Sequence, residues 1–324
     1  MIHGIDSIHF AHLHELPCGQ KDLRRTGAAI QASMQGSRHK HLRRATGRSH
    51  ASDYEHTQHR VRQRRPSMGE PSFSGRAGNQ NKETAESMRL PEIKGFVDLS
   101  LVDWDGKVSA VLFLPHCNFR CPFCYNTTLV LEPDRMATIP YEEVEQYLTR
   151  NKKWLDGVAI TGGEPTLQPA LPTLCQWIKR LDLQVKLDTN GTNSPMVQKL
   201  IADALVDYIA LDVKAPLNNE KYSQSVGINA EKLLSKVGTT IDILLANPVD
   251  YEFRTTLVPT IHKQDDIRQI CRRIEGCRKY ILQNFKGGVE TLDPKCRNIT
   301  PFSPHELAEF LRLARETVPN TALR

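Results

Sequence analysis

The chain lacks the long apolar runs and the dense cysteines of membrane-spanning and disulfide-stapled proteins. Its 324 residues contain no apolar run of about 18 residues, so the sequence offers no membrane-spanning helix. The first residues, MIHGIDSIHFAHLHELPCGQ, contain no continuous apolar stretch of the kind found in secretory signals. Eight cysteines are too few for a disulfide scaffold in a chain this long. We therefore expect a cytoplasmic protein with no membrane partner.

Most of the chain also lacks an excess of either charge. Residues 1–90 hold 15 Lys and Arg against 8 Asp and Glu, whereas residues 91–324 hold 28 against 29. Nine of the twelve histidines lie in residues 1–90 as well. Because the body of the chain is balanced, we expect no nucleic-acid footprint across it.

Residues 1–90 lack any helical or strand period and are rich in Arg, His, Ser, Gln and Gly. Such a segment cannot bury enough apolar surface to offset its ordering entropy. We expect a disordered, basic extension ahead of one core domain in residues 91–324, and the alternative is an arm that binds nucleic acid or a partner. Met88 opens the part where order is expected to begin, so the extension is also a candidate for sequence outside the natural translated protein.

From residue 91 onward, strand-like and helix-like segments alternate six times. The predicted strands are 108–115, 157–165, 184–191, 206–216, 251–259 and 278–285. The predicted helices are 141–154, 170–181, 194–205 with Ser194 as N-cap, 230–247 with a possible break at Gly238, 263–274 and 303–315. This alternation predicts an α/β fold with a parallel sheet. Polar motifs at the ends of most strands favour a curved, barrel-like sheet over an open one.

Three cysteines lie within the stretch HCNFRCPFCYN, at Cys117, Cys121 and Cys124. A structural zinc site needs four ligands, and no second Cys-x-x-Cys pair supplies the rest. An iron–sulfur cluster of four irons takes four thiolates, so three would leave one iron open for a ligand. We therefore interpret the stretch as a cluster site, with a zinc knuckle or plain buried thiols as the alternative.

The spacing Cys-x₃-Cys-x-aromatic-Cys, with Phe123 as the aromatic residue, resembles the signature of the radical S-adenosylmethionine (SAM) superfamily. The resemblance implies a partial (β/α)6 barrel. It also implies a 4Fe-4S cluster whose open iron binds S-adenosylmethionine, which one electron then cleaves.

Further motifs extend the resemblance. Gly162, Gly163, Glu164 and Pro165 in TGGEPT resemble the family's motif that binds the methionine amino group. Asp188 in LDTNG would by resemblance lie near the adenosyl group, and the alternative is an Asx turn.

Two cations follow in later strands. Arg254 in FRTTLVP is a charge within an apolar segment, so it needs an anionic partner. The resemblance supplies the methionine carboxylate, and the alternative is an ion pair with a core Asp or Glu. The same argument applies more weakly to Lys214 in LDVKAP.

Residues 91–320 resemble the activating enzymes of glycyl radical enzymes, in particular those of anaerobic ribonucleotide reductase. The resemblance implies that enzyme as partner and a ferredoxin or flavodoxin as electron donor. Two departures are His116, where relatives often carry Gly, and the absence of a His in LQNFKGG, which argues against a pyruvate formate-lyase activase.

Two other functions remain open from the sequence. One is a small-molecule radical SAM enzyme, such as a deazaguanine synthase of queuosine biosynthesis, and the other is a non-enzymatic iron–sulfur or RNA-binding protein. We interpret the five remaining cysteines as ordinary thiols: Cys18, Cys175, Cys271, Cys277 and Cys296.

Overall fold

The computed structural model describes residues 90–246 and 248–324, and the predicted extension lies outside them but for its last residue. One sheet of eight strands organises this part, and the strands lie in chain order from β1 to β8. The first pair is antiparallel, and every later pair is parallel. The strands are β1 Gly95–Ser100, β2 Ser109–Leu114, β3 Gly157–Gly162, β4 Gln184–Thr189, β5 Tyr208–Asp212, β6 Asp250–Leu257, β7 Tyr280–Asn284 and β8 Thr321–Leu323.

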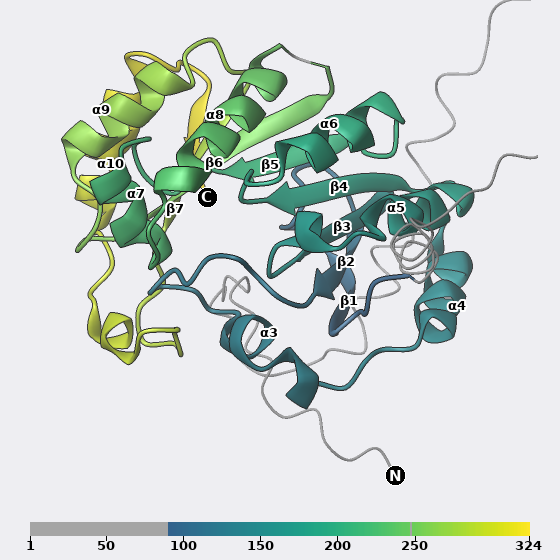
Figure 1. Ribbon diagram of the computed structural model, residues 1–324. Helices are drawn as coiled ribbons and strands as arrows, with labels where there is room; N and C mark the ends of the chain where they lie inside the picture. The colour runs from purple at the N-terminus through teal and green to yellow at the C-terminus, as the bar shows by residue number, and fades with distance from the viewer. Residues whose placement is uncertain (1–89, 247) are drawn as a thin grey trace, which may run out of the picture. The chain divides into compact units, whose positions relative to one another are not determined.

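A helix follows each of the strands β2 to β7, which confirms the six predicted units. Figure 1 shows the strands turning along a curved sheet, with α4, α5, α6 and α8 along its outer side. Among the described residues β1 and β8 pair with one neighbour each, so the barrel is partial, as predicted. The α-helices are α3 Thr127–Leu131, α4 Tyr141–Asn151, α5 Leu171–Arg180, α6 Ser194–Ala202, α7 Asn219–Val226, α8 Glu231–Leu245, α9 Gln264–Arg273 and α10 Pro304–Arg315.

Two local predictions were wrong. The N-cap of α6 is Asn193, whose side chain accepts a hydrogen bond from Met196 N–H, and Ser194 is the first helical residue. Helix α8 runs through Gly238 without a break. One glycine inside a helix costs only about 1 kcal/mol, which the packing of α8 outweighs.

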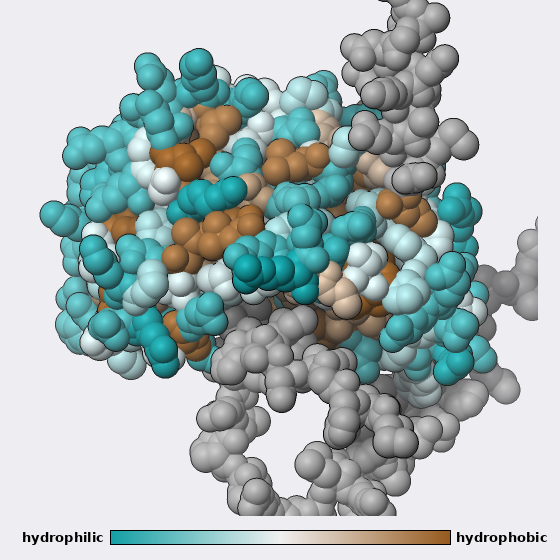
Figure 2. Space-filling view, turned by 60° about the horizontal axis from the view of Figure 1, so that its bottom comes forward, coloured by the Kyte–Doolittle hydropathy of each residue, from teal (hydrophilic) through white to brown (hydrophobic). Residues whose placement is uncertain are grey.

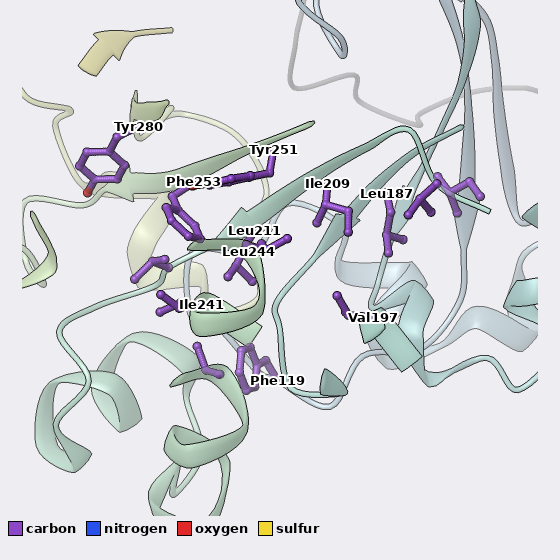
Figure 3. Packing of buried hydrophobic residues seen from close by; sticks show 14 of the residues in the cluster. Phe119, Leu187, Val197, Ile209, Leu211, Ile241, Leu244, Tyr251, Phe253 and Tyr280 are labelled. Carbon is purple, nitrogen blue, oxygen red and sulfur yellow. The ribbon is translucent and has the colours of Figure 1, made fainter. Parts of the chain in front are cut away.

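The core lies between the sheet and its outer helices. Leu187, Ile209 and Leu211 of β4 and β5 lie opposite Val197 of α6 and Ile241 of α8 (Figure 3), and all five are fully buried. Burial of one such side chain contributes about 1.5–3 kcal/mol. Because side chains alternate along a strand, the residues between these point to the inner side of the curve.

The described surface has no membrane-spanning element. No helix within residues 90–246 and 248–324 is long and apolar enough to cross a membrane. Figure 2 shows small apolar areas separated by polar side chains, which is ordinary for a protein surface. The large exposed apolar side chains are Leu99, Leu101, Val102, Leu131, Trp154, Leu167 and Leu323.

Candidate active site

The cysteine loop, residues 115–126, follows β2 and is anchored in the core at its middle. Phe119 is 2% exposed and lies among the core side chains near α8 (Figure 3). Its ring meets that of Tyr222 of α7 edge-on, with centroids 6.2 Å apart. Arg120 N–H donates to Val226 O over 2.8 Å. The loop passes so close that a Cβ on Gly227 would lie 2.0 Å from Arg120 O, so α7 holds one side of it.

The turn after β3 holds a second side of the cysteine loop. Glu164 N–H donates to His116 O over 2.7 Å, and Gly163 N–H donates to Leu114 O over 2.9 Å. A Cβ on Gly163 would lie 1.9 Å from His116 O. The φ of Gly162 is +115°, a conformation that favours glycine. The two glycines therefore permit a close approach between two loops of the protein itself.

His116, where the family resemblance led us to expect glycine, has a φ of +69°, a conformation that favours glycine. Asparagine, aspartate and histidine are the side chains that tolerate this left-handed conformation best after glycine. A histidine is therefore among the side chains that this turn accepts most readily in place of glycine.

Glu164 is almost fully buried and bonds only to the protein. Its carboxylate accepts hydrogen bonds from Thr166 N–H and Oγ1, from Thr189 Oγ1 over 2.7 Å, and from Asn190 N–H over 2.6 Å. Burial raises the pKa of Glu164, and these donors oppose the rise. The side chain therefore ties the β3 turn to the β4 turn, while Pro165, which is buried, begins the 3-10 helix Pro165–Leu167.

A third side of the cysteine loop is held by the segment after β7, which the sequence did not predict. Leu292 N–H donates to Cys124 O over 3.0 Å, and Asp293 N–H donates to Pro122 O over 2.9 Å. The rings of Tyr125 and Phe285 are stacked, with centroids 5.9 Å apart. These partners are more than 150 residues away in the chain, so no local pattern signals them.

The three predicted cysteines lie in one neighbourhood. Burial raises the pKa of Cys117 to about 11 and that of Cys121 to about 12, and it also raises the pKa of Cys124. The Glu164 carboxylate and then Cys124 raise the pKa of Cys117 further, and Cys124 and Cys117 do so for Cys121. Nearby Lys214 lowers the pKa of all three thiols. The protein environment alone therefore keeps the thiols protonated at neutral pH.

This donor set fits an iron–sulfur cluster better than a single ion. Within the described ranges, no three His, Cys, Asp or Glu side chains are placed to hold one metal ion. A cluster of several irons offers each thiolate its own iron, so its ligands need not converge on one point. Three soft thiol ligands, two of them half-buried and one buried, match that requirement.

A row of five alternating charges crosses the inner side of β4, β5 and β6. Lys186 lies 2.9 Å from Asp188, and Asp188 lies 3.2 Å from Arg254. Arg254 Nε donates to Asp212 over 2.9 Å, and Lys214 lies 3.1 Å from the same carboxylate. Burial alone would raise the pKa of Asp212, but Arg254 and Lys214 outweigh it and lower that pKa. Lys214, at one end of the row, is the cation that lowers the pKa of all three thiols.

The contacts in this row bear on the alternatives left open for Arg254 and Asp188. Arg254, 8% exposed, pairs with two core aspartates, which is the alternative left open for it. The Asp188 carboxylate pairs with Lys186 and Arg254, so within the described chain its oxygens serve ion pairs rather than an Asx turn. Lys214 is fixed through its backbone carbonyl, to which Ser225 Oγ donates over 2.8 Å.

His262, which the sequence did not single out, also fixes Lys214. Its Nδ1 accepts from Val258 N–H over 3.0 Å, so its Nε2 carries the proton and donates to Lys214 O over 2.9 Å. Burial lowers the pKa of His262, and the neutral ring is the form that makes both contacts.

Comparisons with known proteins agree with this geometry. Residues 111–265 match the model of the radical SAM superfamily. A protein of Methanocaldococcus jannaschii named "Putative glycyl-radical enzyme activating enzyme" is 34% identical over 233 residues, which cover 72% of this chain and 95% of that protein. A 7-carboxy-7-deazaguanine synthase of Hyperthermus butylicus is 38% identical over only 87 residues, 26% of this chain and 36% of that protein.

Among solved structures, SuiB of Streptococcus suis bound to S-adenosylmethionine superposes with a TM-score of 0.51 and 15% identity. The match covers 66% of this chain and 51% of that one, so this chain spans about half its length and the likeness concerns the fold alone. The family match and the near full-length relative together decide the assignment. The chain belongs to the radical SAM superfamily, whose members use a 4Fe-4S cluster and S-adenosylmethionine.

Proposed function

We propose that this protein activates a glycyl radical enzyme, by resemblance the anaerobic ribonucleotide reductase. The observation that carries the proposal is the 34% identity over 95% of a relative named as such an activating enzyme. The matches to deazaguanine synthases and GTP cyclases cover smaller parts of this chain and of those relatives. A ferredoxin or flavodoxin is the proposed electron donor.

In this proposal, the cysteine loop holds the cluster. The ligands are Cys117, Cys121 and Cys124, and Phe123, 5% exposed, packs the loop against the core. When bound, the cluster supplies the electron that cleaves S-adenosylmethionine. Because α7, the β3 turn and the segment after β7 each hold the loop by backbone hydrogen bonds, its position is set before the cluster binds.

We propose that the row of charges binds the methionine end of S-adenosylmethionine. Lys214 pairs with one carboxylate and lies beside the thiols, so it is the cation best placed to meet the methionine carboxylate. Arg254 already holds two carboxylates and supports this role by fixing Asp188 and Asp212. The β3 turn, Gly162 to Pro165, supplies the backbone next to the first cysteine.

Anaerobic reconstitution followed by two measurements tests the proposal. The protein should bind about four irons and form 5′-deoxyadenosine from S-adenosylmethionine and a reductant. Added to anaerobic ribonucleotide reductase, it should produce the electron paramagnetic resonance (EPR) doublet of a glycyl radical. Cleavage that requires a purine-like small molecule and magnesium, with no radical on the reductase, would instead support a deazaguanine synthase. Stoichiometric zinc that iron cannot replace would refute both.

A further inference from the structure

A closed ring of three side-chain hydrogen bonds joins the cysteine loop to the turn after β4. Asn118 Nδ2 donates to Thr192 Oγ1 over 2.8 Å, and Thr192 Oγ1 donates to Asn190 Oδ1 over 2.7 Å. Asn190 Nδ2 closes the ring by donating to Asn118 Oδ1 over 2.9 Å. Asn190 and Thr192 are each 5% exposed, so water has little access to the ring.

The backbone decides which way the Asn190 amide points. Thr192 N–H donates to Asn190 Oδ1 over 3.0 Å, so the oxygen must face Thr192 and the nitrogen must face the cysteine loop. The backbone N–H of Asn190 is held in turn by the Glu164 carboxylate over 2.6 Å. Four hydrogen bonds therefore fix this one residue.

The Asn190 nitrogen reaches the first cysteine. Its distance to Cys117 Sγ is 4.0 Å, and the same sulfur accepts from Phe119 N–H over 3.4 Å. An amide nitrogen carries two protons, so one can serve Asn118 while the other faces the sulfur. The Glu164 carboxylate, which holds the Asn190 backbone N–H, therefore helps to position the amide that faces Cys117.

We infer that Asn190 is a positioning residue that donates an N–H to the Cys117 sulfur and raises the reduction potential of the bound cluster. The inference rests on the function proposed above. Hydrogen bonds to cluster sulfurs are one of the factors that set the potential. Reduction adds negative charge to the cluster, and a donor bonds more strongly to the more negative sulfur. The donor therefore stabilises the reduced state more than the oxidised one.

The test is the midpoint potential of the reconstituted cluster, measured by anaerobic redox titration with EPR detection. Asn190→Leu removes the donor at similar side-chain size, and Asn190→Ser is a smaller neutral variant should the leucine variant fail to fold. Asn284→Leu is the matched control, because Asn284 Nδ2 also donates a hydrogen bond, over 2.9 Å, but to Phe302 O rather than to a thiol, and Asn284 lies outside the cysteine loop. Iron content is measured for every variant.

Loss of the donor should make the cluster about tenfold harder to reduce, a shift of about 59 mV to more negative potential for one electron. The control should keep the wild-type potential. Wild-type potentials in both Asn190 variants, or an equal shift in the control, would overturn the inference while leaving the proposed function intact. A wild-type protein that binds no iron–sulfur cluster would overturn the proposed function itself.

Discussion

Replacement of Gly163 by alanine tests how the β3 turn holds the cysteine loop. The new Cβ would lie 1.9 Å from His116 O and 2.5 Å from His116 C. Atoms that are not covalently bonded to each other cannot approach this closely. Both neighbours are backbone atoms, so no side-chain rotation relieves the contact. One of the two loops must move away from the other.

The cost follows from what that movement breaks. The hydrogen bonds Glu164 N–H to His116 O, 2.7 Å, and Gly163 N–H to Leu114 O, 2.9 Å, would both be lost. A typical hydrogen bond contributes about 0.5–1.5 kcal/mol net, and overpacking a tight site costs about 1–3 kcal/mol. We therefore expect Gly163→Ala to lower the free energy of unfolding by roughly 2–6 kcal/mol.

Urea unfolding of the cluster-free protein measures this cost, and Gly238→Ala is the matched control. The nearest atoms to a Cβ on Gly238 lie 3.7 and 3.8 Å away, which is ordinary contact. Inside helix α8 the alanine should stabilise the protein by about 1 kcal/mol. On reconstitution, Gly163→Ala should lose iron and the control should not. A Gly163→Ala protein with wild-type unfolding and full iron content would refute the close-contact argument.

Three further predictions concern the thiols, the charge row and the extension. Alanine at any one of the three cysteines should abolish S-adenosylmethionine cleavage and lower the iron content, while circular dichroism of the cluster-free protein stays unchanged. Arg254→Ala leaves Asp188 and Asp212 with one lysine partner each and should cost about 1.5–3 kcal/mol in urea unfolding, whereas an unchanged midpoint would mean that the pairs carry little energy. Arg254 helps to hold the pKa of Asp188 and Asp212 below the ordinary value. The two carboxylates therefore stabilise the folded protein above about pH 4, and this contribution is lost as the pH falls further. The variant should lose less stability than wild type over that acid range. A chain beginning at Met88 should cleave S-adenosylmethionine at the full-length rate, and a loss of more than about tenfold, some 1.4 kcal/mol in the barrier, would contradict the predicted division of the chain.

The fold could be predicted from the sequence because its signals are local and repeated. Each strand–helix unit carries its own apolar period, and consecutive strands pair in chain order, so reading along the chain reproduces the sheet. Strands β1 and β8 were not predicted. Strand β1 precedes the six units and pairs antiparallel with β2, and the three residues of β8 are too few to show a period. The helix start at Ser194 was misplaced by one residue because Asn193 is an equally good cap, and only the backbone shows which side chain accepts the hydrogen bond.

The sequence predicted which residues form the candidate site, but it did not predict which partners they contact. The cysteine spacing and the β3 turn are contiguous motifs, whereas the partners of each side chain come from other strands. Glu164 has the residue type of a cofactor ligand, yet its oxygens are taken by Thr166, Thr189 and Asn190. Arg254 has the type of a carboxylate binder, and the carboxylates it holds are the protein's own. Residue type indicates the chemistry of a group, and only the fold determines which partner receives it.

The hydrogen bonds from Leu292 and Asp293 to the cysteine loop have a consequence for synthesis of the protein. Chains emerge from the ribosome N-terminus first, at about 5–20 residues per second. The cysteines are therefore exposed to the cell well before the segment that completes their surroundings exists. During that interval the loop is held on at most two of its three sides. Stable iron loading thus belongs to the finished chain, and an incomplete chain that takes up a metal would release it more readily.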